Sequence, residues 1–158
     1  MLDDAIDWLA EQGGRFVAVE RASKKPLGAG WQNKPLTAEE AMRHTERGGN
    51  VGLLTGAPSD GLVVLDLDYR YREFIAKFPH LAHGPRITRP NEPNRAKLLF
   101  RSSDGVPAPR KWKPYDNQPP HAELLSTGNH ALIPPSMHPS GSLFELHGEE
   151  NPIPIYAL

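Results

Sequence analysis

The sequence has 158 residues, a formal net charge of −1 and no cysteine. This length suits a single domain, residues 1–158, and the lack of cysteine excludes disulfides and thiolate zinc sites and fits a reducing cytoplasm. The longest apolar runs are too short for a membrane span and the N-terminus is acidic, so we expect no membrane partner, no signal peptide and a cytoplasmic protein.

Helices and strands alternate in the first half of the chain. Residues 3–12 have apolar residues at helical spacing and stop at Gly13, and Thr37 with Glu40 forms a capping-box signature for a helix that ends at Gly48. Strands are predicted over residues 16–19, 51–54 and 62–68, with a loop over 22–34 and a short helix over 71–78.

Strands dominate the second half. They are predicted over residues 97–100, 122–125, 130–133 and 143–146. Residues 104–120 are polar, basic and rich in proline, which favours a long functional loop. This order of elements predicts an α+β fold with an antiparallel or mixed sheet.

The strand at residues 62–68 ends in two aspartates. Asp66 and Asp68 lie two residues apart, so their side chains share one face of the strand, roughly 6.5–7 Å apart along it. Two carboxylates this close repel each other, and a divalent cation removes the repulsion. The alternative is a strand that runs into a solvated acidic turn.

A third carboxylate lies in a short apolar strand. Glu123 needs a charged partner or a metal if it is buried there, and it is a water-facing edge residue if it is not. If its strand neighbours the Asp66 strand, three carboxylates converge, as a two-metal phosphoryl-transfer site requires.

Positive charge is concentrated in one segment. Residues 86–113 hold eight basic residues and two acids, which suggests a face that meets phosphate or nucleic acid, or else a solvated basic loop. Within it, Arg95 and Lys97 share a strand face and suit a triphosphate beside a metal site. Either could also be a solvated strand start.

A strand that runs into two prolines ends the candidate site. Pro134 and Pro135 must end the strand ladder, and Ser136 and His138 follow on a rigid turn that can hold polar groups near a ligand. None of the seven histidines shows a metal-ligand spacing, and a lone histidine is usually structural or solvated.

Four stretches together resemble the bifunctional primase–polymerase domain of the archaeo-eukaryotic primase superfamily, found in phage and plasmid replication proteins. They follow the order of the family's motifs over nearly the whole chain. They are Lys25-Pro26 with Gly30-Trp31; residues 50–56 leading into the Asp66-Leu67-Asp68 motif; Asn94 to Phe100 in the position of the family's s-x-H motif; and Glu123, Gly128 and Pro134-Pro135-Ser136-Met137-His138-Pro139-Ser140-Gly141.

The resemblance implies an RNA-recognition-like catalytic sheet with a small N-terminal α/β unit. It also implies a DNA-templated nucleotidyltransferase, a primase and polymerase, that uses a template, a primer, nucleoside triphosphates and possible helicase partners. The catalytic and metal-binding residues would be Asp66, Asp68 and Glu123, holding two Mg²⁺ or Mn²⁺ ions. Arg95, Lys97, Ser136 and His138 would bind the nucleotide. Arg110, Lys111, Trp112 and Lys113 would bind DNA, with Trp112 stacking on a base.

Two positions depart from the family pattern. Lys97 replaces the histidine of the second motif and keeps its positive charge, and Glu123 stands where aspartate is common. Two other functions share the acidic face: a weak or inactive DNA-binding module of a replication protein, and a metal-dependent phosphodiesterase.

Overall fold

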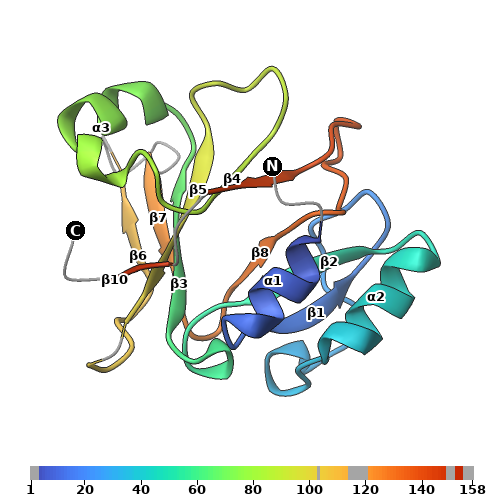
Figure 1. Ribbon diagram of the computed structural model, residues 1–158. Coiled ribbons are helices and arrows are strands. Elements are labelled where there is room, and N and C mark those ends of the chain that lie inside the picture. The colour runs from blue at the N-terminus through green and yellow to red at the C-terminus, as the bar shows by residue number, and fades with distance from the viewer. Residues whose placement is uncertain (1–3, 103, 114–120, 149–151, 155–158) are drawn as a thin grey trace.

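The computed structural model describes residues 4–102, 104–113, 121–148 and 152–154, which form two sheets and three α-helices (Figure 1). The helices are α1 (Ala5–Glu11), α2 (Ala38–Glu46) and α3 (Tyr71–Lys77), and three 3₁₀ turns are η1 (Trp31–Asn33), η2 (Ala57–Ser59) and η3 (Pro79–Leu81). The strands are β1 (Arg15–Val19), β2 (Asn50–Leu54), β3 (Leu62–Leu67), β4 (Arg86–Thr88), β5 (Ala96–Arg101), β6 (Arg110–Trp112), β7 (Ala122–Leu125), β8 (His130–Leu132), β9 (Glu145–His147) and β10 (Ile153–Pro154).

The larger sheet is built around β3. Its strand order is β6-β7-β3-β5-β4-β9, with antiparallel pairing along that path, and β10 pairs in parallel with β5. The sheet is therefore mixed, one of the two arrangements that the sequence predicts. Every β3 residue except Asp66 is buried, because β3 lies between β5 and β7 and both of its faces are covered.

The two faces of this sheet belong to two separate hydrophobic clusters. On what we call the inner face, Leu62 and Val64 pack in the cluster that contains α1, β1 and β2. On the outer face, Val63, Leu65 and Leu67 pack in a second cluster, with α3 against it. In Figure 1, α3 accordingly lies on the opposite side of the large sheet from α1 and α2.

The smaller sheet closes the inner face. It has the antiparallel order β1-β2-β8, with α2 packed on β1 and β2. The chain leaves the large sheet after β7 and enters the small sheet at β8. Thr55 holds this crossing, because its hydroxyl donates to the carbonyls of Ser126 (2.6 Å) and Asn129 (3.1 Å). The crossing places the end of β7 and the start of β8 beside the same space between the sheets.

The element boundaries agree with most of the sequence-based predictions. The capping box is confirmed: Thr37 Oγ1 accepts from the Glu40 amide (3.3 Å), and Glu40 accepts from the Thr37 amide (3.3 Å). No helix in the described ranges is long and apolar enough to cross a membrane.

Two predictions are corrected, and two strands, β4 and β10, were missed. The segment predicted as one long loop contains strand β6, which pairs with β7, while residues 103 and 114–120 lie outside the described part. Strand β9 begins two residues later than predicted, at Glu145. Strand β4 was not predicted, because three residues that include two polar ones carry no usable periodicity.

Candidate active site

Four charged side chains form a row across the inner face of the large sheet. Asp66 of β3 lies opposite Glu123 of β7 on one side and opposite Lys97 of β5 on the other. Lys111 of β6 lies opposite Glu123, with its Nζ 3.8 Å from Glu123 Oε1. Directly opposite residues on neighbouring antiparallel strands have Cβ atoms about 4.5–5.5 Å apart. The two central carboxylates therefore repel each other, and a cation flanks each of them.

Asp68 extends this acidic group past the end of β3. Its amide donates to the His121 carbonyl (3.1 Å), which fixes the backbone where β3 stops. The side chain is half-buried, and burial raises the pKa of its carboxyl, as does the nearby Asp66 carboxylate. Arg95, Lys97 and Lys24 oppose that rise in the pKa of Asp68. The acid thus sits in a partly shielded place where a positive ligand would stabilise its ionised form.

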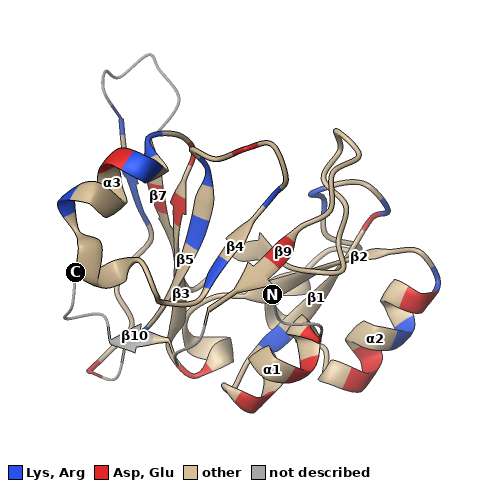
Figure 2. Ribbon diagram, turned by 45° about the horizontal axis from the view of Figure 1, so that its top comes forward, with Lys and Arg blue, Asp and Glu red and all other residues tan. Residues whose placement is uncertain are grey.

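A basic pocket adjoins the carboxylates. Asp66, Asp68 and Phe144 line it together with five basic or imidazole side chains, Lys24, Arg89, Arg95, Lys97 and His138. A second pocket shares Lys24, Asp66, Lys97 and Phe144 and continues to Glu123 and His130. We call the two together the groove. In Figure 2, acidic residues appear as red bands on β3 and β7, and basic residues appear as blue bands on β5.

Lys97 is the cation most enclosed by this groove. Burial lowers the pKa of its ammonium, and the neighbouring Lys24 and Arg89 lower it further, whereas Asp66 and Asp68 raise it. Its Nζ lies 4.8 Å from the centre of the Phe144 ring. The Arg89 guanidinium is 5.9 Å from the same ring and the His138 ring 6.1 Å. Phe144 is thus a shared floor for three groups that can meet an anion.

His138 has a defined tautomer in its neutral form. The Ser140 amide donates to His138 Nδ1 (3.1 Å), so Nδ1 is an acceptor and the ring proton lies on Nε2. Burial and the surrounding cations, Arg89 first, lower the pKa of the imidazole. The neutral ring can therefore donate from Nε2 to a phosphate oxygen.

Ser136, predicted to bind the nucleotide, does not lie with these residues. Its side chain is fully buried. Its hydroxyl accepts from the Val51 amide (2.8 Å) and donates to the Val51 carbonyl (2.9 Å). The structure therefore places Ser136 as a bridge between the turn after β8 and strand β2, and not in the groove.

The basic segment does not form one face, contrary to the simplest interpretation of its charge. Arg89, Arg95 and Lys97 line the groove, whereas Arg101 binds Asp60 (3.3 Å) at the far end of β5. The predicted DNA-binding group is also divided. Lys111 shares the inner face with Glu123, while Arg110 and Trp112 lie on the outer face, opposite Leu124 and Ala122. Lys113 follows β6 and is exposed.

Sequence reasoning missed four residues of the groove: Lys24, Arg89, His130 and Phe144. Lys24 stands next to the Lys25-Pro26 motif, and the bridge between Val19 and Pro26 folds that loop back onto the small sheet. His130 packs edge-on against Trp31 with ring centres 5.2 Å apart. Its Nδ1 is buried without a hydrogen-bond partner, and burial lowers the pKa of the ring. Each of these four residues stands alone in its strand or loop, so no spacing pattern in the sequence predicts its position in the groove.

The carboxylates fit a hard divalent cation only as part of a larger ligand set. Among the described residues, no three His, Asp or Glu side chains are grouped closely enough to hold a metal ion by themselves. Mg²⁺ usually takes one or two carboxylates and completes its shell with water and substrate phosphates. An all-oxygen donor set beside a basic pocket suits that mode of binding.

Two comparisons with known proteins bear on this site. A family model described as "Bifunctional DNA primase/polymerase, N-terminal" matches residues 6–155, nearly the whole chain. No curated protein matches the chain.

Proposed function

This chain belongs to the bifunctional DNA primase/polymerase N-terminal family, and from that premise we propose that it is a metal-dependent, DNA-templated nucleotidyltransferase that acts in phage or plasmid replication. The observation that carries the proposal is the row in which Asp66 lies between Glu123 and Lys97. It places acids suited to a metal directly beside cations suited to a triphosphate.

The carboxylates of Asp66, Asp68 and Glu123 would hold two Mg²⁺ or Mn²⁺ ions. Bound there with the nucleotide, such ions would promote attack by the 3′-hydroxyl and neutralise charge on the leaving pyrophosphate. Asp66 and Glu123 lie opposite each other and repel, with Lys97 and Lys111 flanking the pair, and a divalent ion between the two carboxylates would stabilise them further.

The basic side of the groove would bind the nucleotide. The triphosphate would lie beside Phe144, in the pocket that is lined by Lys24, Arg89, Arg95 and Lys97. Arginine and lysine side chains stabilise the negative charge that develops on the leaving pyrophosphate. His138 would donate a hydrogen bond from Nε2 to a phosphate oxygen. These groups would orient the nucleotide so that its α-phosphate faces the carboxylates.

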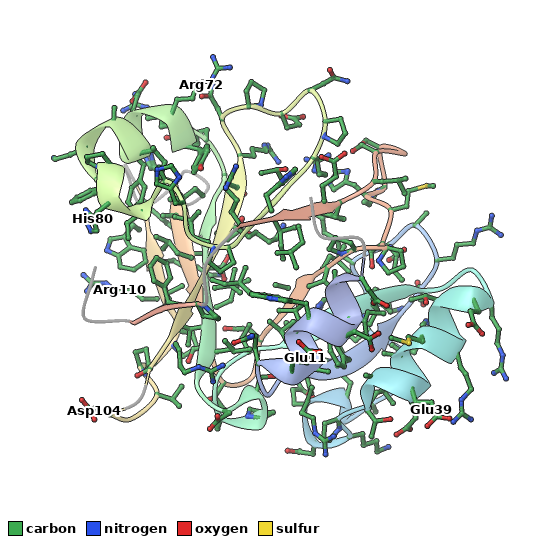
Figure 3. The ribbon with its side chains drawn as sticks, in the orientation of Figure 1. Glu11, Glu39, Arg72, His80, Asp104 and Arg110 are labelled. Atoms are coloured by element: carbon green, nitrogen blue, oxygen red, sulfur yellow. The ribbon has the colours of Figure 1, made fainter. Side chains whose placement is uncertain are left out.

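Primer extension tests the proposal. The chain is incubated with primed and unprimed templates, with ribonucleotides or deoxyribonucleotides, and with Mg²⁺ or Mn²⁺, and products are resolved on a gel. We expect metal-dependent extension of the primed template that is lost in Asp66→Asn and kept in Asp104→Asn. Asp104 is exposed and provides a matched control (Figure 3).

Two observations favour a second candidate, a DNA-binding module of a replication protein without catalysis. The three carboxylates do not form a complete metal site within the described residues, and Lys97 stands where the family motif has histidine. DNA binding without extension under any nucleotide and metal condition would establish this alternative. Release of nucleotides from DNA would instead indicate the phosphodiesterase.

A further inference from the structure

Asn50, the first residue of β2, is buried between two turns that carry residues of the groove. It is only 3% exposed. Its Nδ2 donates to the carbonyls of Ser23 (2.9 Å) and Met137 (2.7 Å), and its Oδ1 accepts from the Met137 amide (3.0 Å). Lys24 follows Ser23 in the chain, and its side chain lines the groove. His138 follows Met137 and lines the groove as well, so one buried side chain is bonded to the residue before each of them.

The side-chain amide of Asn50 fits its partners in one orientation only. Two of the three partners are carbonyls, which only accept, and the third is a backbone N–H, which only donates. Turning the amide over would place Oδ1 against two carbonyls and Nδ2 against an N–H. Both donors of the amide are thus used, and the width of one side-chain amide sets the spacing of the two turns.

Each turn is closed by its own hydrogen bonds. Residues 20–25, which we call the Lys24 turn, are closed by a bond from the amide of the first residue to the carbonyl of the last (2.9 Å). Residues 136–142, which we call the His138 turn, are closed by a bond from the His138 amide to the Ser142 carbonyl (2.8 Å). Since each turn is held together by itself, Asn50 acts on where the two turns stand relative to one another.

The side chains carried by the two turns act on one another and on the rest of the groove. Burial and the Arg89 guanidinium lower the pKa of His138, and the Lys24 ammonium of the other turn lowers it further. Lys24 also stands among the cations that surround the buried Lys97. Like charges of this kind repel, so an ammonium on an unanchored turn would move away into water. A fixed backbone is needed to keep Lys24 in the groove.

We propose that Asn50 is a positioning residue for polyphosphate binding, which holds the Lys24 ammonium and His138 Nε2 at a spacing that one triphosphate chain spans. Without its side chain each turn would still form, but the distance between the turns would vary. The cost of ordering them would then fall on the binding of the ligand. That this ligand is the incoming nucleotide of a polymerase rests on the proposed function, whereas the coupling of the two turns does not.

Isothermal titration calorimetry without DNA tests the inference, with ATP and with inorganic tripolyphosphate as probes, each in the presence of Mg²⁺. Asn50→Ala should weaken both probes by about tenfold or more, because two charge-assisted contacts are loosened together. Ser59→Ala is the matched control. Ser59 is also fully buried, and its hydroxyl joins the backbones of Arg15 and Leu54 at the other end of β2. It should lower stability to urea and leave the affinity for both probes unchanged.

A double-mutant cycle separates positioning from a general loss of stability. The background is the double variant Lys24→Ala, His138→Ala, in which the groove keeps Arg89, Arg95 and Lys97. If Asn50 acts through the two side chains that this background lacks, adding Asn50→Ala to it should change the affinity for tripolyphosphate no further. A loss as large as in the wild-type background would show that Asn50 acts on the whole fold, and would overturn the proposal.

Hydrogen exchange of the wild-type chain gives a test that does not depend on whether Asn50→Ala folds. Tripolyphosphate should slow amide exchange in the Lys24 turn and in the His138 turn together. Protection of only one turn would overturn the proposal. Wild-type affinity in Asn50→Ala, an equal loss in Ser59→Ala, or a wild-type chain that binds neither probe would overturn it as well.

Primer extension distinguishes a failure of this proposal from a failure of the proposed function. If probe binding depends on Asn50 as expected while the wild-type chain extends no primer, the positioning role stands and the polymerase function fails. If the wild-type chain extends primers and Asn50→Ala does so with an unchanged apparent KM for nucleotide, the polymerase function stands and the positioning role fails.

Discussion

At the scale of single residues, the carboxylates of β3 have a clear energetic signature. Asp66 faces Glu123 across the strand pair, and Asp68 is half-buried beside both Asp66 and the basic pocket. Burial and the Asp66 carboxylate raise the pKa of Asp68 despite the nearby cations, so the ionised form of Asp68 is retained at a cost to stability. Residues of this kind are typical of functional sites, where charges are placed for a ligand rather than for the fold.

We predict that Asp66→Asn and Asp68→Asn each abolish nucleotide addition and leave single-strand affinity near that of the wild type. The amide keeps the side-chain shape but removes a negative charge that a divalent ion needs. Stability should stay equal or rise slightly in Asp68→Asn, because burial and Asp66 already disfavour that carboxylate, whereas Asp66→Asn should lower it, because the buried Lys97 loses the carboxylate opposite it. Primer extension, anisotropy and urea unfolding measure the three effects, with Asp104→Asn as the control. Substantial residual extension in either variant would contradict the metal assignment.

Lys97 tests the nucleotide side of the groove. If its ammonium binds the triphosphate, Lys97→Ala should raise the apparent KM for nucleotide by about ten- to a hundredfold, the equivalent of roughly 1.5–3 kcal/mol for a hydrogen bond to a charged group. Lys97→His, which restores the residue of the family motif, should recover part of the lost nucleotide affinity. The recovery should be incomplete, because the imidazole side chain is shorter than that of lysine. Lys34→Ala, which removes an exposed charge outside the groove, serves as the control. A changed template affinity with unchanged nucleotide dependence would place Lys97 on the DNA path instead.

Ser136 should behave as a structural residue. Ser136→Ala removes the hydroxyl that accepts from the Val51 amide in a fully buried place, while the Val51 carbonyl still accepts from the Ile133 amide (3.2 Å). An unsatisfied buried polar group costs about 1–3 kcal/mol, so the free energy of unfolding should fall by that order. Urea denaturation measures the loss, and the apparent KM for nucleotide should not change in the folded protein. A raised KM with unchanged stability would return Ser136 to the nucleotide site.

At the scale of elements, a strand that is buried on both faces, such as β3, could be predicted from sequence, and the exposed edge strand β6 could not. The run from Leu62 to Leu67 is almost continuously apolar, as a central strand must be, and it was predicted nearly to its ends. Strand β6 has three exposed residues, two of them charged, and is stabilised by pairing with β7 rather than by burial. Local composition cannot predict such a strand, because the strand is stabilised by pairing with a segment that is distant in the sequence.

The residues of the candidate site could likewise be predicted only where a local sequence pattern places them. The i, i+2 spacing fixed Asp66 and Asp68 on one face, and the register confirms that the Glu123 strand is adjacent. Lys24 and Phe144 reach the groove only through the packing of the two sheets, for which the sequence offers no short-range pattern. The division of Arg110 and Lys111 between two faces likewise appears only once β6 is known to be a strand.

The capping box of α2 gives a prediction at the scale of this helix. Thr37→Ala removes the side chain that accepts from the Glu40 amide and should lower the free energy of unfolding by about 1 kcal/mol. Glu40→Gln should be nearly neutral, because glutamine can make the same reciprocal bond to the Thr37 amide. Thermal or urea unfolding of the two variants provides the comparison. Equal stability of Thr37→Ala and the wild type would show that tertiary packing alone holds the start of α2.

For the whole molecule, the near-neutral net charge hides a division of charge in space. The groove and the sheet edge carry clustered cations, whereas α1 and α2 display mostly acids (Figure 2). A nucleic acid that approaches this molecule is therefore attracted to one side of it and repelled from another, and the net charge does not describe the interaction. Such an arrangement should orient a strand toward the groove before any specific contact forms.

This division makes the salt dependence of binding the decisive global measurement. Each phosphate neutralised on a single strand contributes about −0.7 to the slope of log affinity against log salt concentration. The triple variant Arg110→Ala, Lys111→Ala, Lys113→Ala should therefore flatten the slope by about 2 if all three cations meet phosphates. The control triple, Arg21→Ala, Arg43→Ala, Arg47→Ala, changes the net charge by the same amount but removes exposed cations in and around α2, and its slope should match the wild type. If both triple variants flatten the slope equally, only the overall charge matters and no phosphate path along the sheet edge exists. If neither variant flattens the slope, the strand is bound by the groove cations Lys24, Arg89 and Arg95 alone.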